Sequence, residues 1–315
     1  MGNRIFGVVA GAVCAAGALV GCEPGSGRYI DVGYFAAGDL VAQNDVVYGS
    51  APALPDQNMP PGGIEQLKLD VIMPKPDVDP ETRRPGLVWI HGGGFKSGSK
   101  AAGTGRATEW ASRGYVVVNI DYRLDQDNRC QDIQDGVPVP DIEVQQCRDA
   151  ILAAQHDAQG AVRWLRAHAD ALHLDPGKIG VEGSSAGAVT AVNLAYNSDD
   201  PGSSNDLPGP SDVQAAAALS GAAYPGIAGI GPGDAPVIYA HCTNDQAVDW
   251  AITSAGIDEA HAAGLVADVL VWSPPSSCAP GEIHAVSLLK AHGPEINLAF
   301  SQFLYRHLHL SQTED

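Results

Sequence analysis

Positively charged side chains are scarce in this 315-residue sequence, which has 18 lysines and arginines against 37 aspartates and glutamates. Residues 1–21 contain one arginine and no acidic residue, so the chain from Cys22 onward carries 17 − 37 = −20 charges. Nucleic acids and anionic lipid surfaces are bound through clusters of lysine and arginine. We therefore expect neither a nucleic-acid partner nor electrostatic docking on anionic lipid.

Metal-binding patterns are also missing. None of the six cysteines lies in a C-x-x-C arrangement, and the ten histidines form no cluster with metal-ligand spacing. We expect no metal site and no cofactor. The sequence has no internal repeat, no long low-complexity segment and no linker that would divide it, so we expect one large domain over residues 45–312.

The N-terminus has the pattern of a targeting segment. A basic start, "MGNR", precedes 17 apolar or small residues at positions 5–21, a run typical of a signal-peptide core and short for a transmembrane helix. The run ends in "LVGC", which resembles the lipobox of bacterial lipoproteins and implies acylation of Cys22. We expect a signal peptide over residues 1–21, a lipidated N-terminus and tether over 22–44, and export to a bacterial cell membrane. Secretion without lipid is the alternative.

The cysteine count is consistent with export. Cys14 would leave with the signal peptide and Cys22 would take the lipid. An even number of remaining cysteines in an oxidising compartment favours two disulfides, and four cysteines allow three pairings. We favour Cys130–Cys147 and Cys242–Cys278, with four buried thiols as the alternative.

Strand-like and helix-like segments alternate along the chain. Short and mostly apolar segments predict strands at 45–51, 66–74, 86–93, 115–122, 175–183, 213–221, 235–242 and 267–273. Helical patterns fall at 108–113, 150–172, 185–196, 247–263 and 295–308, and a polar loop is expected over 124–148. This alternation predicts a mostly parallel sheet with helices on both faces and an antiparallel edge formed by the first two strands.

Two short glycine-rich motifs suggest chemistry. In "IGVEGSSAGAVT" (179–190), Ser185 fits G-x-S-x-G whereas Ser184 does not. A chain this rich in glycine yields roughly 0.3 such matches by chance, so the motif needs its context. That context is present, because the serine lies between a buried strand and a helix. Upstream, "HGGGF" (91–95) also follows a strand, and its backbone N–H groups could hold an oxyanion together with that of Ala186.

The chain resembles the α/β-hydrolase superfamily, and within it the carboxylesterase/lipase group with an HGGG motif, over roughly residues 45–310. The resemblance rests on "LDVIMP", "HGGGF", "YVVVNIDYRL", "HDAQGAVRWLRAHADALHLDPGKIGVEGSSAG" and "AHCTNDQAVDW". It implies Gly93 and Gly94 as oxyanion donors, with Gly92 and His91 shaping the turn. Ala188 stands where the family usually has glycine.

The superfamily's order of catalytic residues is serine, acid, histidine. Asp245 follows the penultimate strand and is the expected acid, with Asp249 as the alternative. The histidine should follow the last strand, where His284 is the expected residue. The other candidates there are His292, His307 and His309.

These residues predict a serine carboxylic-ester hydrolase in which Asp245 orients His284 and His284 activates Ser185 for acyl-enzyme formation. About a dozen residues separate the strands at 213–221 and 235–242, which leaves no room for a large cap domain. We therefore expect short-chain or carbohydrate-linked ester substrates. A peptidase or amidase, or a non-catalytic surface-binding lipoprotein, are the alternatives. Arg123 and Asp157 are expected to form an ion pair between loops.

Overall fold

The computed structural model describes residues 26–54, 63–198, 200–204, 207–275, 278–281 and 283–311. The predicted signal peptide and Cys22 lie outside these ranges. Within them, no helix combines the length and the hydropathy that crossing a membrane requires.

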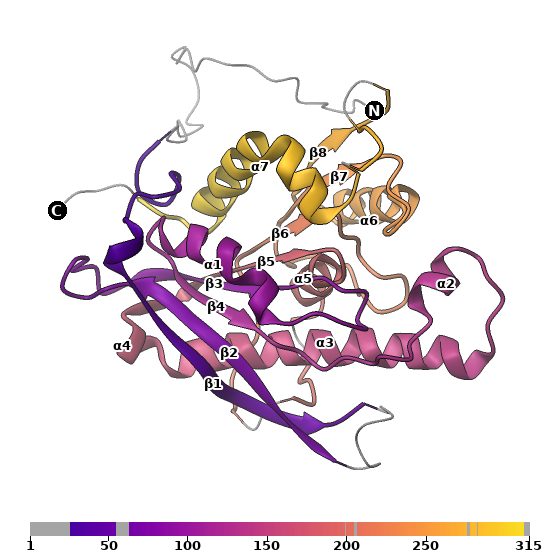
Figure 1. Cartoon of the computed structure of the whole chain (residues 1–315), viewed down its shortest axis with the longest axis horizontal. Helices are drawn as coiled ribbons and strands as arrows, with labels where there is room; N and C mark the ends of the chain where they lie inside the picture. The colour runs from indigo at the N-terminus through magenta and orange to yellow at the C-terminus, as the bar shows by residue number, and fades with distance from the viewer. Residues whose placement is uncertain are drawn as a thin grey trace.

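The core of the molecule is an eight-stranded sheet with the strand order β1-β2-β4-β3-β5-β6-β7-β8 (Figure 1). The β1–β2 and β2–β4 pairs are antiparallel, and every other neighbouring pair is parallel. The strands are β1 (Leu40–Pro52), β2 (Ile64–Pro74), β3 (Arg84–Ile90), β4 (Val116–Ile120), β5 (Leu174–Ser184), β6 (Ala215–Leu219), β7 (Val237–Cys242) and β8 (Ala267–Trp272). The predicted parallel sheet with an antiparallel edge is confirmed.

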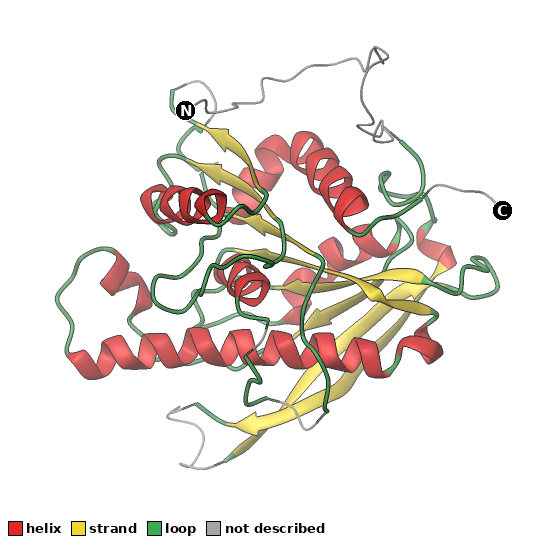
Figure 2. Cartoon of the chain, turned by 180° about the vertical axis from the view of Figure 1, so that it is seen from behind, coloured by secondary structure: helices red, strands yellow, loops and turns green. Residues whose placement is uncertain are grey.

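Helices cover both faces of this sheet (Figure 2). Residues of α3, α5 and α6 form one hydrophobic core with the strands, and residues of α1 and α7 form a second core on the other face. The helices are η1 (Ala37–Asp39), η2 (Lys100–Gly103), α1 (Thr104–Ala111), α2 (Cys130–Gln134), α3 (Asp141–Ala167), α4 (Ala169–Leu172), α5 (Ala186–Tyr196), α6 (Trp250–Ala262) and α7 (Ala285–His307).

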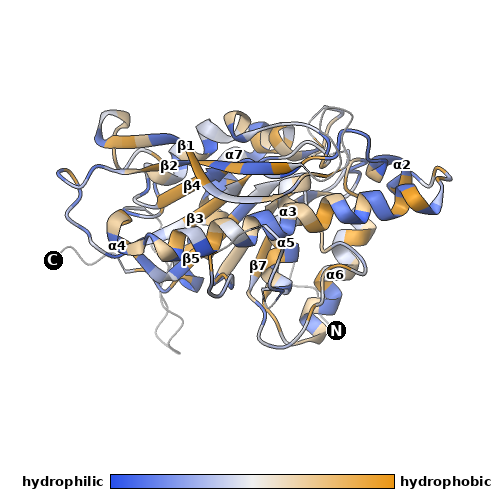
Figure 3. Ribbon diagram, turned by 90° about the horizontal axis from the view of Figure 1, so that it is seen from below, coloured by the Kyte–Doolittle hydropathy of each residue, from blue (hydrophilic) through white to orange (hydrophobic). Residues whose placement is uncertain are grey.

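The central strands are mostly apolar because both of their faces are covered. Every residue of β3, β4, β6 and β7 is buried, as expected for parallel strands between helical layers. Burying a single Val or Leu side chain of this kind contributes about 1.5–3 kcal/mol. By contrast, β1 is mostly exposed or half-buried. Helices α2 and α3 carry both hydrophobic and hydrophilic residues (Figure 3). The sheet thus forms a rigid base for the loops at its edges.

The expected loop over 124–148 is wrong, because α2 and the first part of α3 lie within it. Pro140 precedes the first turn of α3 with φ −60°, and Asp141 and Glu143 occupy that turn. A fixed proline φ and acidic residues at the N-terminus both favour the start of a helix. The apolar pattern is weak there, since Ile142 is 66% exposed.

The two ends of the domain also differ from expectation. The tether predicted through residue 44 ends earlier, since residues 27–35 form hydrogen bonds with the body and β1 begins at Leu40. The last helix begins at Ala285 instead of residue 295. It contains a kink, where His292 has non-helical backbone angles just before Pro294. Only the part after the kink has the regular apolar spacing that predicts a helix.

Candidate active site

Ser185 lies in the sharp turn that joins β5 to α5. Its backbone has φ +55° and ψ −123°, a region that residues other than glycine rarely occupy. The Ser185 N–H donates to the carbonyl of Leu219 at 2.9 Å, which fixes the turn against β6. This strained strand–turn–helix arrangement is that of a nucleophile elbow. Ser184, the other candidate, is buried at 6% exposure.

Glycine is sterically required on both sides of this turn. A Cβ atom on Gly183 would lie 2.0 Å from the carbonyl oxygen of Gly187, and one on Gly187 would lie 2.2 Å from that of Ile90. No side chain fits at either position, so both glycines of G-x-S-x-G have a structural cause. Ala188 is accommodated because its neighbour is Gly221, where an added Cβ would lie 2.4 Å from that of Ala188.

A chain of hydrogen bonds connects Ser185 to His284 and Asp245. Nε2 of His284 lies 2.8 Å from Oγ of Ser185, and Nδ1 of His284 lies 2.7 Å from Oδ2 of Asp245. An ionised carboxylate only accepts hydrogen bonds, so Nδ1 carries the proton and Nε2 accepts from the serine hydroxyl. This is the tautomer that a general base needs to take a proton from serine.

The loop after β7 holds the Asp245 carboxylate in place. Its Oδ1 accepts hydrogen bonds from the backbone N–H groups of Ala247 at 2.8 Å and Val248 at 3.1 Å. Burial raises the pKa of Asp245, but the hydrogen bond and charge of His284 together with these two N–H groups outweigh it. The net pKa therefore lies below the ordinary aspartate value. Asp245 is thus held ionised beside His284.

The alternative acid and the alternative histidines make other contacts and do not take part in this chain of hydrogen bonds. Asp249 accepts from the N–H of Ala251 at 2.9 Å and caps α6. His292 lies at the kink of α7, and its ring stacks on Trp272 with centroids 4.5 Å apart. The two remaining candidates lie at the other end of α7, where His307 contacts a phenylalanine ring and His309 follows the last turn.

The glycine-rich loop after β3 lies against the nucleophile. A Cβ on Gly92 would lie 3.0 Å from Cβ of Ser185. Gly93 and Gly94 have φ +131° and +64°, and the Gly93 carbonyl accepts from residues 96 and 97, which turns the loop back on itself. Within the described ranges, the N–H groups of Gly93, Gly94 and Ala186 have no hydrogen-bond acceptor in the protein. Ala186 is also the first residue of α5, where the helix dipole favours negative charge.

Asn128 contacts this loop and was not found from the sequence. Its Nδ2 donates to the carbonyls of Gly94 at 3.2 Å and Asp125 at 2.8 Å, and its Oδ1 accepts from the N–H of Cys130 at 3.1 Å. The side chain is 2% exposed. Asn128 thus connects the Gly94 peptide to the start of α2. A single asparagine in a polar segment carries no signal of such a contact.

A second histidine, His241 on β7, contacts Asp245 and was also missed. Its Nε2 lies 2.9 Å from the carbonyl of Val248 and 3.6 Å from Oδ2 of Asp245. Burial lowers the pKa of His241 and outweighs the nearby carboxylate, which raises it. A neutral His241 donates to Val248 and supports the loop that carries the acid. In the sequence it is one polar residue within an apolar strand.

Three further side-chain pairs that were predicted from the sequence are present in the structure. The predicted Arg123–Asp157 ion pair is present at 2.9 Å, and both residues are buried. The structure also contains both favoured disulfides, which join the remaining cysteines as Cys130–Cys147 and Cys242–Cys278. The first attaches α2 to α3, and the second joins the end of β7 to the segment that precedes His284. Each therefore restrains a loop that contributes to the site.

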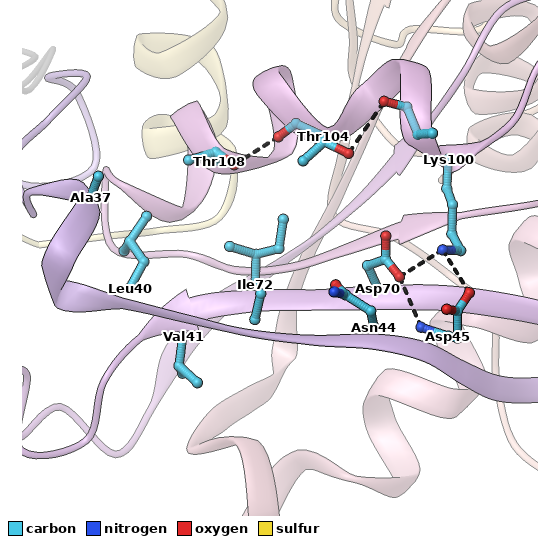
Figure 4. Close-up of a pocket in the computed structure, with 12 residues that line it drawn as sticks. Ala37, Leu40, Val41, Asn44, Asp45, Asp70, Ile72, Lys100, Thr104 and Thr108 are labelled. Carbon is cyan, nitrogen blue, oxygen red and sulfur yellow. Dashed lines mark hydrogen bonds and ion pairs between the residues drawn. The ribbon is translucent and has the colours of Figure 1, made fainter.

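A cavity of about 460 Å³ lies away from these residues, between α1 and the β1–β2 edge (Figure 4). Leu40 and Ile72 line its apolar part. At its polar end, Nζ of Lys100 lies 3.0 Å from Asp45 and 2.8 Å from Asp70. One ammonium faces two carboxylates here, so the polar end of the cavity has an excess of one negative charge. In the described part of the chain, no group of three or more His, Cys, Asp or Glu side chains could hold a metal ion.

Comparisons with known proteins agree with this architecture. A family model described as BD-FAE matches residues 69–139 and 130–223. Thermogutta terrifontis esterase 2 with propionate bound superposes with a TM-score of 0.62 at 21% identity, over 86% of this chain and 96% of that one. Its butyrate-bound structure has a TM-score of 0.62 at 22% identity, over 79% and 92%. The chain therefore has the α/β-hydrolase fold, and the BD-FAE model spans residues 69–223, just under half of its length.

The sequence alignments with curated relatives cover a smaller part of the chain than the structural superpositions do. Esterase LipI of Mycobacterium tuberculosis is 30% identical over 128 residues, which is 40% of this chain and 33% of that protein. An AB hydrolase superfamily protein of Schizosaccharomyces pombe is 32% identical over 118 residues, 37% of this chain and 28% of that protein. The aligned part spans a third or less of either relative.

Proposed function

We propose that this protein is a serine hydrolase of carboxylic esters, with Ser185 as nucleophile, His284 as general base and acid, and Asp245 as the residue that orients the imidazole. The observation that carries the proposal is the unbroken hydrogen-bonded chain from Asp245 through His284 to Ser185. Three unpaired N–H groups beside the serine complete the machinery that acyl transfer needs.

The reaction follows from this arrangement. Oγ of Ser185 attacks the ester carbonyl carbon while Nε2 of His284 takes the hydroxyl proton. The N–H groups of Gly93, Gly94 and Ala186 hold the resulting oxyanion, and one such donor typically lowers the barrier by about 3–4 kcal/mol. The intermediate expels the alcohol, which takes the proton from His284. A water molecule, deprotonated by His284, then cleaves the acyl-enzyme and releases the carboxylic acid.

The proposed substrates are short-chain or carbohydrate-linked esters. Residues 220–236, which connect β6 to β7, contain no helix and provide no cap over the site. An open entrance suits small or polymer-attached esters better than long acyl chains, which need an extended apolar tunnel. The propionate and butyrate bound to the Thermogutta esterase are short acyl groups of this kind and support the proposal.

The second part of the proposal concerns location. The 17-residue apolar run and the "LVGC" motif support export and lipidation of Cys22, which would make the protein a membrane-anchored lipoprotein. Two or more acyl chains give stable anchoring, whereas one gives only reversible binding. The body itself would then act on small-molecule or carbohydrate esters in the surrounding water.

A series of p-nitrophenyl esters from acetate to palmitate tests the proposed activity. We expect hydrolysis that is fastest for acetate to butyrate, falls with chain length, and disappears in Ser185→Ala. An inactive but folded protein would favour a peptidase or a non-catalytic surface protein on the same scaffold. Activity that rises toward palmitate would contradict the proposed open site.

A further inference from the structure

Residues 27–35, near the start of the described part of the chain, are fixed to the body of the protein. The guanidinium of Arg28 donates to both carboxylate oxygens of Asp79, at 3.0 and 2.8 Å. The N–H of Tyr29 donates to the carbonyl of Arg113 at 2.8 Å, and the Tyr29 side chain is 4% exposed. A partly buried charge pair and a buried aromatic ring hold this segment in one place.

The segment is attached at the edge of the sheet opposite the active site. Arg113 lies between α1 and the first residue of β4, and Asp79 lies shortly before β3. Ser185 and Asp245 instead follow the last residues of β5 and β7. Because β3 to β8 are parallel, these are opposite edges, and Figure 1 shows the indigo N-terminal segment and α2 at opposite ends of the molecule.

We propose that the face formed by residues 27–35 and 75–84, here called the amino-edge face, lies against the membrane that anchors the protein. The active site then opens away from that membrane. The orientation rests on the proposed lipidation of Cys22, and the assignment of substrates rests also on the proposed esterase activity. It assigns the substrates to water-soluble or polymer-bound esters and excludes the ester lipids of the anchoring membrane.

The length of the chain supports this orientation. Between Cys22 and Gly27 the chain reaches at most ~18 Å, whatever its conformation. A domain of this size is roughly 50 Å across. A lipid on Cys22 therefore holds the amino-edge face near the bilayer and cannot bring the opposite edge to it while residues 27–35 stay docked.

The exposed and charged residues at the two edges of the sheet also support this orientation. On the amino-edge face, Val32, Tyr34 and Val78 are 50%, 46% and 42% exposed, and tyrosine is favoured at the membrane–water interface. Residues 75–84 carry three acidic and three basic side chains. At the active-site edge, residues 121–149 carry eight acidic side chains against three arginines. Anionic headgroups repel such a segment at short range.

Energy transfer to the membrane tests this orientation. The full-length lipoprotein is reconstituted in phosphatidylcholine–phosphatidylglycerol vesicles that contain an acceptor-labelled lipid. The donor dye is attached to Asp170→Cys, in α4 just before β5, or to Val137→Cys, in the loop between α2 and α3; both residues are exposed. We expect transfer to be at least about twofold more efficient from position 170, given a body roughly 50 Å across. Equal transfer, or stronger transfer from position 137, would overturn the inference.

A second readout uses two substrates in the same vesicles. We expect the anchored enzyme to hydrolyse p-nitrophenyl acetate as fast as the unanchored chain and to leave a fluorogenic short-acyl glycerolipid in its own bilayer intact. Comparable rates on both substrates would refute the orientation. A flexible Gly/Ser insertion of about 30 residues after Gly25, reaching ~30 Å, should reduce the difference in energy transfer.

The outcomes separate the two proposals. Failure to hydrolyse p-nitrophenyl acetate, with the dye at position 170 still closer to the membrane, would reject the esterase activity and keep the orientation. Mass spectrometry of the N-terminal peptide reports lipidation directly. An unmodified Cys22, or a protein that does not bind the vesicles, would reject the orientation and leave the esterase activity standing.

Discussion

At the scale of single residues, Asp245 and Asp249 lie only four residues apart in the sequence but make different contacts. Both are aspartates in the same loop region, and both accept backbone N–H groups. Only Asp245 also faces Nδ1 of His284. The order of the sequence elements favoured Asp245 as the acid. The side-chain positions add that Asp245 contacts His284 whereas Asp249 caps α6, which supports the proposed role of Asp245.

Replacing Asp245 should therefore affect catalysis, whereas replacing Asp249 should affect only stability. Asp245→Asn keeps the shape but favours the wrong imidazole tautomer, so kcat should fall about 10⁴-fold. Asp249→Ala should leave kcat unchanged and lower the stability by about 1 kcal/mol through loss of the cap. Ester hydrolysis and urea unfolding of both variants measure this. A large loss of kcat in Asp249→Ala would reverse the assignment.

Asn128 provides a test of how the oxyanion loop is positioned. Without its Nδ2 donor, the Gly94 peptide loses a buried partner and can shift, and misplacement by about 1 Å can cost ~10²-fold in rate. We expect Asn128→Ala to lower kcat about ten- to a hundredfold with little change in KM. Asn128→Asp should not rescue it, because a carboxylate cannot donate to the Gly94 carbonyl.

Gln145→Ala is the matched control for Asn128, since Gln145 is exposed on α3 and bonds only to Asp149 among the described contacts. It should behave as the unmodified protein. A rise in KM with unchanged kcat in Asn128→Ala would mean that Asn128 contacts substrate instead of positioning the loop.

At the scale of elements, the sequence predicted most strands and helices because burial produces a clear pattern. The buried strands β3, β4, β6 and β7 are short apolar runs, and they were found within two or three residues of their bounds. The segments that were missed do not bury a regular face. α2 and the start of α3 extend beyond the sheet (Figure 1), so their sequence resembles a polar loop.

The same reasoning explains which parts of the candidate site could be predicted from the sequence. Ser185, Asp245, His284 and the glycines occur at ends of strands and in motifs of recognisable order. Asn128 and His241 act through contacts between segments distant in sequence, and neither lies in a motif. Contacts of this kind depend on the tertiary fold and leave no local pattern.

The Cys242–Cys278 disulfide offers a test at this scale. It closes a segment of 36 residues between β7 and the residues before His284, and a crosslink over such a length typically contributes about 3–4 kcal/mol. We expect Cys242→Ala/Cys278→Ala to lower the melting temperature and also kcat, because the acid and histidine loops lose their covalent connection. An unchanged kcat and melting temperature would show that the fold alone positions the triad.

At the scale of the whole molecule, we expect buried and half-buried histidines to contribute to the response of the protein to acid. Burial lowers the pKa values of His91, His241 and His307, the last to about 4. The unfolded chain therefore binds protons first, at pH values near 6.5. The stability that these groups contribute is present above pH 6.5 and is lost as the pH falls toward their folded-state values. Asp245, whose pKa is lowered, loses its contribution only below about pH 4.

His307 can be changed without touching the site, because it lies in the last turn of α7 against Phe303. We expect the melting temperature to fall less between pH 7 and pH 5 in His307→Gln than in the unmodified protein. Differential scanning calorimetry at the two pH values measures this. An identical loss would show that His307 binds protons equally in the folded and the unfolded protein, and would contradict a lowered pKa in the folded state.

The most direct measurement is covalent labelling of the nucleophile with paraoxon. Attack by Oγ of Ser185 forms a serine–phosphorus bond and releases p-nitrophenol, so the modified peptide gains one diethylphosphoryl group. We predict one label per chain on Ser185, complete loss of ester hydrolysis, and full labelling in Ser184→Ala. Labelling that persists in Ser185→Ala, or an active enzyme after complete labelling of Ser185, would contradict the assignment of Ser185 as the nucleophile.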